Sequence, residues 1–149
     1  LCKSMGRLFA IDYGRKRVGI AVTDELQIIA NALTTVRTVE IFDFISQYLT
    51  DNVVDAFIIG YPLNMNGQPS ESTKDIEPFV NKLRKTYPHI PIYRVDERFT
   101  SVIAKDVILQ TGVKKVKRQD KSLVDKISAT IILQSFMENP NFYINKSKL

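Results

Sequence analysis

The sequence has few of the residues on which several common protein chemistries depend. Only one cysteine, Cys2, occurs in 149 residues, which excludes an intramolecular disulfide and a cysteine-based zinc cluster and indicates a reducing cytoplasm. The single histidine, His89, argues against histidine-centred triads and zinc sites. Because prolines lie on both sides of it, we expect His89 to be an exposed loop residue.

Long apolar runs and tryptophan are also absent. Apolar runs such as residues 56–59 are far too short for a transmembrane span, and residues 1–4 lack the apolar segment of a signal peptide. We therefore expect a cytoplasmic protein with no membrane partner. Aromatic residues make up 9% of the chain, without an interleaved stacking motif. Any nucleic acid is therefore expected to be recognised by its backbone and shape more than by its bases.

The composition is that of a globular domain with an excess of positive charge. The chain contains 21 Lys and Arg against 16 Asp and Glu, a net charge of +5, and its pI is near 9.3. This excess favours an anionic partner such as nucleic acid. We expect residues 1–149 to form one domain, with residues 1–4 and about 138–149 as terminal extensions.

The hydrophobic pattern predicts an α/β fold with the order βββαβαβαα and a five-stranded mixed sheet. Strands are expected over residues 7–12, 18–23, 28–36, 54–60 and 92–95. Helices are expected over residues 39–49, about 72–87, 100–110 and about 122–137. The first three strands form an antiparallel meander, and helical crossovers make the fourth and fifth strands parallel to the first. Helices then cover both faces of the sheet.

Three acidic residues from distant segments form the candidate catalytic and metal site. Asp12 ends the first strand, Glu97 follows the fifth, and Asp125 begins the last helix. Ligands of such sheets collect at the carboxyl ends of the parallel strands. Converging carboxylates without a nearby histidine favour Mg²⁺ or Mn²⁺ over zinc. With a basic surface around them, they suggest metal-dependent cleavage of a phosphodiester.

Each acid also has a purely structural interpretation. Asp12 can cap its own turn, with Gly14 allowing the turn or the close approach of a phosphate. Asp96 competes with Glu97, because strand alternation sends their side chains to opposite faces. Asp125 stands three residues after Ser122, as in a helix capping box.

Two basic segments flank these acids. One is the turn directly after Asp12, and the other is the connector over residues 112–121, which we expect to order on nucleic acid. Both can alternatively be solvated surface. The candidate nucleic-acid-binding residues are Arg15, Lys16, Arg17, Arg98, Lys114, Lys115, Lys117 and Arg118.

Four motifs, in the same order, resemble those of the YqgF (RuvX-like) family and span nearly the whole chain. They are residues 12–21 (DYGRKRVGIA), 60–67 (GYPLNMNG), 96–101 (DERFTS) and 124–129 (VDKISA). The resemblance implies a ribonuclease H-like fold with Asp12, Glu97 and Asp125 as the acidic triad. It further implies a nuclease associated with maturation of the 5′ end of pre-16S ribosomal RNA, a family also described as Holliday junction resolvases. Lys126 and Ser128 stand where the family usually has glutamine and alanine.

Several alternatives remain open at the level of sequence. The substrate is either an RNA precursor or branched DNA, and a homodimer would suit paired cuts in a four-way junction. A nucleic-acid-binding module with this fold but without turnover is a second class. Sugar-kinase and actin-like ATP sites share the Asp-x-Gly strand, but they need two such lobes, and 149 residues offer room for one.

Overall fold

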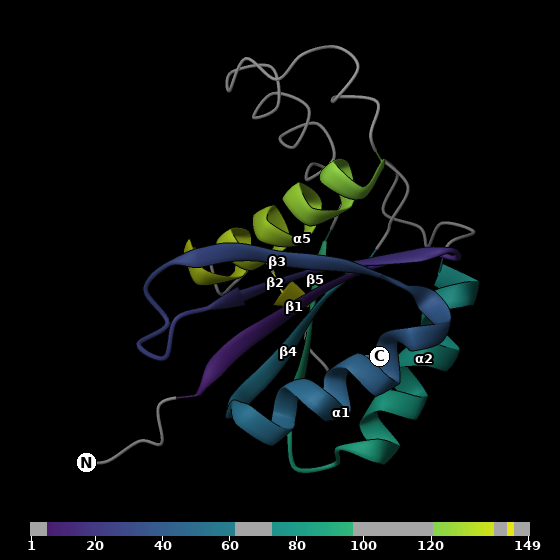
Figure 1. The fold of residues 1–149 in the computed structure, drawn as a ribbon, viewed down its shortest axis with the longest axis horizontal. Coiled ribbons are helices and arrows are strands. Elements are labelled where there is room, and N and C mark those ends of the chain that lie inside the picture. Colours follow the sequence, from purple (N-terminus) through teal and green to yellow (C-terminus); the bar gives the residue numbers. More distant parts are fainter. Residues whose placement is uncertain (1–5, 62–72, 97–120, 139–142, 145–149) are drawn as a thin grey trace.

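The computed structural model describes residues 6–61, 73–96, 121–138 and 143–144, which form a sheet between two layers of helices (Figure 1). The strands are β1 Arg7–Tyr13, β2 Arg17–Thr23, β3 Ala30–Arg37, β4 Val54–Tyr61, β5 Ile92–Asp96 and β6 Tyr143–Ile144. The helices are the 3₁₀ turn η1 Thr38–Glu40, α1 Ile41–Asp51, α2 Thr73–Thr86 and α5 Lys121–Glu138. Within these residues no helix is long and apolar enough to cross a membrane.

The strands are arranged in the order β3-β2-β1-β4-β5-β6. β1 pairs antiparallel with β2, and β2 with β3, whereas β1, β4 and β5 are mutually parallel. The mixed sheet predicted from the sequence is therefore confirmed. β6 is an addition, because Tyr143 and Ile144 pair antiparallel with Val95 and Arg94. Two residues carry too little pattern to be recognised as a strand, and they lie in the stretch expected to be a terminal extension.

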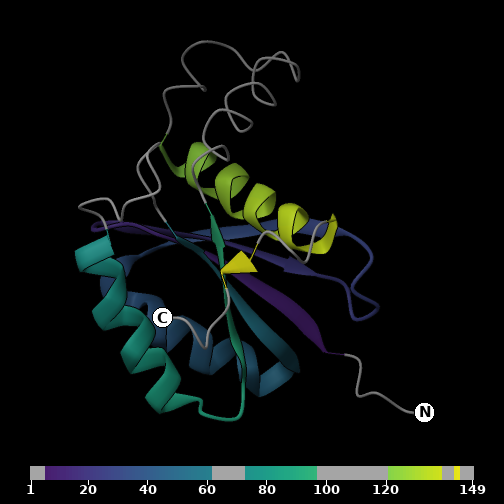
Figure 2. The same ribbon diagram turned by 180° about the vertical axis from the view of Figure 1, so that it is seen from behind.

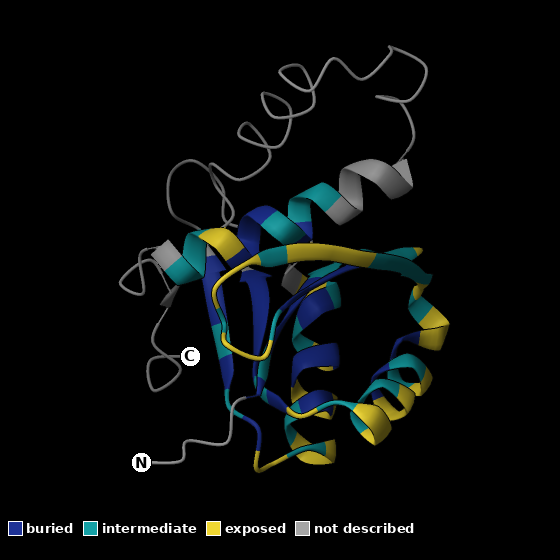
Figure 3. Ribbon diagram, turned by 60° about the vertical axis from the view of Figure 1, so that its left-hand side comes forward, coloured by how far each residue is buried: buried dark blue, intermediate teal, exposed yellow. Residues whose placement is uncertain are grey.

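Each face of the sheet has its own apolar core, as the alternation along β1 shows. Phe9 and Ile11 are buried in the core that includes residues of α1 and α2. Leu8 and Ala10 are buried in the core formed with α5. Figure 2 shows α5 on one side of the sheet, and α1 and α2 together on the other. Figure 3 shows the buried residues running along the central strands between these layers.

The predicted element boundaries hold within about two residues. The third strand begins at Ala30, because residues 24–29 form a turn in which the Asp24 carboxylate accepts hydrogen bonds from the backbone of Ile28 and Ile29. Gln27 in this turn has a positive φ of 57°. The first helix begins with η1, followed by α1. His89 is exposed in a turn, as predicted. The helix expected over 100–110 and residue 72, the expected start of the second helix, lie outside the described residues.

Candidate active site and nucleic-acid interface

Asp12 lies near the carboxyl end of β1, on the side of the sheet that α5 covers. Leu8 and Ala10 pack in the α5 core, and successive side chains of a strand alternate between faces, so Asp12 shares their face. Asp12 is half-buried, and its partner in the antiparallel pairing of β1 with β2 is Gly19. Gly19 has no side chain beside the carboxylate. The local structure thus leaves Asp12 partly open to solvent at the rim of the sheet.

The beginning of α5 lies toward the same end of the sheet. Ala129, Ile132 and Leu133 are buried in the α5 core, and α5 packs against β1, β2 and β3. Figures 1 and 2 both show the first turns of α5 at the end of the sheet where β1 finishes. Position 125 is one helical turn before Ala129, in the first turns of this helix. The backbone of Asp125 therefore lies toward the end of the sheet where β1 finishes, as expected. Its side chain is not among those that the structure describes.

Glu97 follows the last described residue of β5, Asp96. The parallel register aligns Ile11 of β1 with Ile59 of β4, and Ile59 with Arg94 of β5. One residue further along each strand, Asp12 is therefore level with Val95. The carboxyl ends of β1, β4 and β5 therefore meet at one edge. Among the described side chains, no group of three His, Cys, Asp or Glu residues is close enough to hold a metal ion. Two of the three predicted ligands are not among those side chains.

The turn between β1 and β2 is tied tightly to η1. Thr38 donates from Oγ1 to the carbonyl of Gly14 at 2.7 Å and from its backbone N–H to the carbonyl of Lys16 at 3.0 Å. A Cβ added to Gly14 would lie 2.6 Å from the Arg17 carbonyl oxygen. Close packing within the turn is therefore sufficient reason for glycine at this position.

The three described cations of this turn have different environments. Arg15 donates from Nε to Asp75 Oδ2 of α2 at 2.6 Å, and its side chain is 75% exposed. Lys16 is exposed, and Arg17 is half-buried. The structure thus keeps all three beside the end of β1, with Arg15 held by a carboxylate. Arg98, Lys114, Lys115, Lys117 and Arg118 lie outside the described residues.

Sequence reasoning missed an aromatic cluster on the other face of the same strand end. Tyr13 stacks on Phe79 of α2, with ring centroids 4.5 Å apart and an interplanar angle of 25°. Phe42 of α1 packs against Phe79 at 5.4 Å. Burial raises the pKa of the Tyr13 phenol, and the Asp75 carboxylate raises that pKa further. These rings come from three separate segments, so no spacing in the sequence indicates that they meet.

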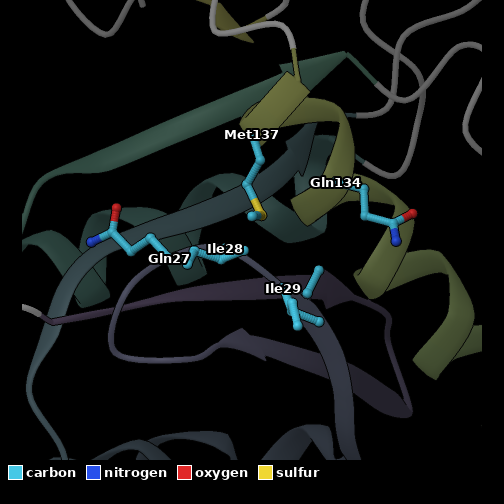
Figure 4. Close-up of a pocket in the computed structure, with 6 residues that line it drawn as sticks. Gln27, Ile28, Ile29, Gln134 and Met137 are labelled. Carbon is cyan, nitrogen blue, oxygen red and sulfur yellow. The ribbon is translucent and has the colours of Figure 1, made fainter.

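A cavity of about 430 Å³ lies at the opposite end of the sheet from Asp12 (Figure 4). It is lined by Gln27, Ile28 and Ile29 of the turn before β3 and by Gln134 and Met137 of α5. The Gln27 side chain donates to the carbonyl of Gly6 at 2.7 Å and to Asp55 at 2.9 Å. These bonds join the β2–β3 turn to the beginning of β1. Because it lies far from Asp12 along the strands, this cavity is not part of the candidate active site.

Comparison with known proteins gives consistent matches over almost the full chain. The family described as "RuvX: Holliday junction resolvase" matches residues 6–139. A protein of Phocaeicola vulgatus named "Putative pre-16S rRNA nuclease" is 56% identical over 138 residues, which cover 93% of this chain and 99% of the relative. A protein of Bacteroides fragilis with the same name is 58% identical over 134 residues, covering 90% and 97%. The structure of T. thermophilus RuvC in complex with a Holliday junction substrate aligns with a TM-score of 0.55 over 92% of this chain and 98% of that one. Its sequence identity of 12% makes this a likeness of fold.

Proposed function

The chain belongs to the RuvX family, and on this basis we propose that it is a metal-dependent nuclease whose catalytic carboxylates are Asp12, Glu97 and Asp125. The observation that carries the proposal is the position of Asp12. It is half-buried at the carboxyl edge of the parallel strands, on the face that α5 covers. This edge is where ligands of open α/β sheets collect.

The alternation along β5 favours Glu97 over Asp96 as the second carboxylate. Val95 is buried in the α5 core, whereas Arg94 is bonded to Glu77 of α2 on the opposite face. A strand continued by one residue would assign position 97 to the face of Val95, and hence of Asp12. Position 96 would fall on the α2 side.

The position of Asp125 supports its role as the third carboxylate. It lies one turn before Ala129, which is completely buried against the sheet. Because α5 begins at Lys121, Ser122 lies inside the helix and not at its N-cap, so the capping box expected from the sequence does not account for the acid at position 125. A shared cation would account for it.

These residues fit a hard divalent cation. Carboxylate oxygens are the ligands that Mg²⁺ and Mn²⁺ prefer, and Asp12 is only half-buried near the carboxyl end of β1. When bound, such an ion neutralises charge at the phosphate and activates water for attack. The protein itself contributes the positions of Asp12, Glu97 and Asp125, together with the cations Lys16 and Arg17 beside the flanking phosphates. Water adds to phosphorus, the P–O bond breaks, and the leaving oxygen takes a proton.

The preferred substrate is the precursor of 16S ribosomal RNA at its 5′ end, processed in the cytoplasm. Relatives at 56% and 58% identity carry the pre-16S rRNA nuclease name, and the matched region covers 99% and 97% of their lengths. The alternative is resolution of branched DNA, favoured by the description of the family, and a homodimer would suit two symmetric cuts. In either case we expect Arg98 and the connector cations Lys114, Lys115, Lys117 and Arg118 to bind phosphates.

The test is a comparison of cleavage of ribosomal precursor RNA, an unrelated RNA and four-way junction DNA by the wild-type protein and a folded Asp12→Asn variant. We expect wild-type cleavage that stops in excess chelator, and loss of at least about a hundredfold in rate in the variant. A matched control is Asp55→Asn, because Asp55 is the second residue of β4, at the opposite end of the sheet. Equal cleavage by Asp12→Asn and the wild type would contradict the proposal. If the wild-type protein bound these nucleic acids but cleaved none of them, the result would favour a nucleic-acid-binding module without catalytic activity.

A further inference from the structure

The aromatic cluster at the end of β1 encloses a cavity on the face opposite Asp12. This cavity, here called the Tyr13 pocket, has a volume of about 300 Å³. Its lining includes Tyr13, Thr38, Val39, Phe42, Phe79 and Lys82. The volume is at the small end of the range of about 300–1,000 Å³ that is typical of ligand pockets. It therefore suits a single planar ring system and excludes a folded segment of chain.

The walls of the Tyr13 pocket combine aromatic rings with a cation. Tyr13 and Phe79 form a stacked pair, and Phe42 packs against Phe79. Lys82 places its Nζ 4.5 Å from the centroid of the Phe42 ring. Aromatic rings interleaved with positive charge are what single-stranded nucleic acids bind, because every base has a π-face and every nucleotide a phosphate.

An exposed apolar side chain marks the entrance of the pocket. Val39 is 77% exposed, the highest exposure among the large apolar residues of the described chain. It belongs to η1, which Thr38 fastens to the β1–β2 turn through hydrogen bonds to Gly14 and Lys16. The entrance is therefore rigidly placed relative to the end of β1.

The pocket and the candidate active site share one strand end. Tyr13 directly follows Asp12, and the two side chains project to opposite faces of β1. Asp12 and the Tyr13 pocket are therefore neighbours at the end of β1, on its two faces. Arg15 and Lys16 lie in the turn that follows Tyr13.

We propose that the Tyr13 pocket binds one unpaired nucleobase of the substrate strand, next to the phosphate that is cleaved. This rests on the proposed nuclease function and adds base recognition to the backbone recognition expected from the sequence. The base would stack on the aromatic wall, and Lys82 would contact its ring acceptors or the adjoining phosphate. The Tyr13 hydroxyl would be available as a hydrogen-bond donor.

The proposal is tested by binding, so that the result does not depend on cleavage. A short single-stranded RNA is prepared as a series in which one position at a time lacks its base, and affinities are measured with the full-length protein in chelator. We expect one position at which removal of the base weakens binding by about tenfold. A flat profile along the whole RNA would overturn the pocket and favour backbone contacts alone.

Two exposed valines provide a matched pair of variants. Val39→Asp places a carboxylate at the entrance and is expected to weaken binding of the intact RNA by about tenfold and to flatten the profile. Val53→Asp introduces the same charge at a residue that is 60% exposed, just before β4 at the other end of the sheet, and is expected to bind like the wild type. Equal affinities of the two variants would also overturn the proposal.

Cleavage assays on the same RNA series separate this proposal from the nuclease function. Metal-dependent cleavage with a flat base-removal profile would contradict the base-binding proposal and support the nuclease function. A profile with one sensitive position but no cleavage under any metal condition would support base binding and contradict the nuclease function.

Discussion

Arg15 Nε and Asp75 Oδ2 lie 2.6 Å apart and join the β1–β2 turn to α2 across 60 residues of sequence. Both side chains are partly or largely exposed, so this ion pair contributes at most about 1 kcal/mol to stability. We expect its larger effect to be on nucleic-acid binding, because the carboxylate neutralises a cation that lies beside the proposed path of the substrate.

The Asp75→Asn variant is therefore expected to bind nucleic acid more tightly than the wild type, by up to about fivefold at low salt. Fluorescence anisotropy with a labelled RNA measures the change. The control is Asp43→Asn, which removes an exposed acid from the first turn of α1. An affinity gain in both variants would show a general charge effect, and no gain in Asp75→Asn would show that Arg15 does not contact phosphate.

A second ion pair joins the middle of β5 to α2. Arg94 is 1% exposed and donates from its guanidinium to Glu77 Oε1 of α2 at 2.9 Å. Glu77→Ala removes one acceptor of a buried charged donor and is expected to lower the free energy of unfolding by about 1–3 kcal/mol. Glu77→Gln retains an acceptor and is expected to cost less than half as much.

Urea unfolding measures both changes. The control is Glu25→Ala, because Glu25 pairs with Arg7 at 3.8 Å and is 73% exposed, which makes that pair worth little. If Glu77→Ala and Glu25→Ala lowered the free energy of unfolding by the same small amount, the buried Arg94–Glu77 pair would not stabilise the packing of α2 on β5.

The turn before β3 is expected to open in acid. The pKa of Asp24 is lowered mainly by the hydrogen bond from the backbone N–H of Ile29, with further bonds from Ile28 and Leu26. Because the folded pKa lies below the ordinary value of 3.8, the stabilisation is complete above that value and is lost as the pH falls through the folded pKa. Amide hydrogen-exchange protection of Ile28 and Ile29 should therefore fall below about pH 4.

The Asp24→Asn variant is the matched control, because it keeps an acceptor oxygen but does not titrate. Its protection factors at Ile28 and Ile29 are expected to be lower than those of the wild type at neutral pH and independent of pH in the acid range. A wild-type turn whose protection is equally independent of pH would contradict this role of Asp24.

The fold was accessible from the sequence because its signals are local. The alternation of strands and the helical spacing in α1, α2 and α5 are set by residues a few positions apart, and right-handed crossovers then determine the parallel pairs. The same alternation explains the position of Asp12. β6 was not predicted, because two residues carry no periodic pattern. β3 starts two residues later than predicted, because Asp24 stabilises a turn in the apolar stretch before it.

Side-chain partners from distant segments could not be predicted in the same way. Nothing near Arg15 indicates Asp75, and nothing near Tyr13 indicates Phe79, since each contact depends on how α2 packs on the sheet. The sequence therefore suggested a surface without stacking aromatics, whereas the structure brings Tyr13, Phe42 and Phe79 together.

The central claim is that carboxylates from three distant segments share one divalent cation. Paramagnetic broadening of backbone amide NMR signals by substoichiometric Mn²⁺ tests it without any substrate. We predict simultaneous broadening around residues 12, 97 and 125 in the wild-type protein and its loss at all three in Asp12→Asn, with Asp55→Asn unchanged. Broadening at only one of these segments, or the same broadening in Asp12→Asn, would contradict the shared site.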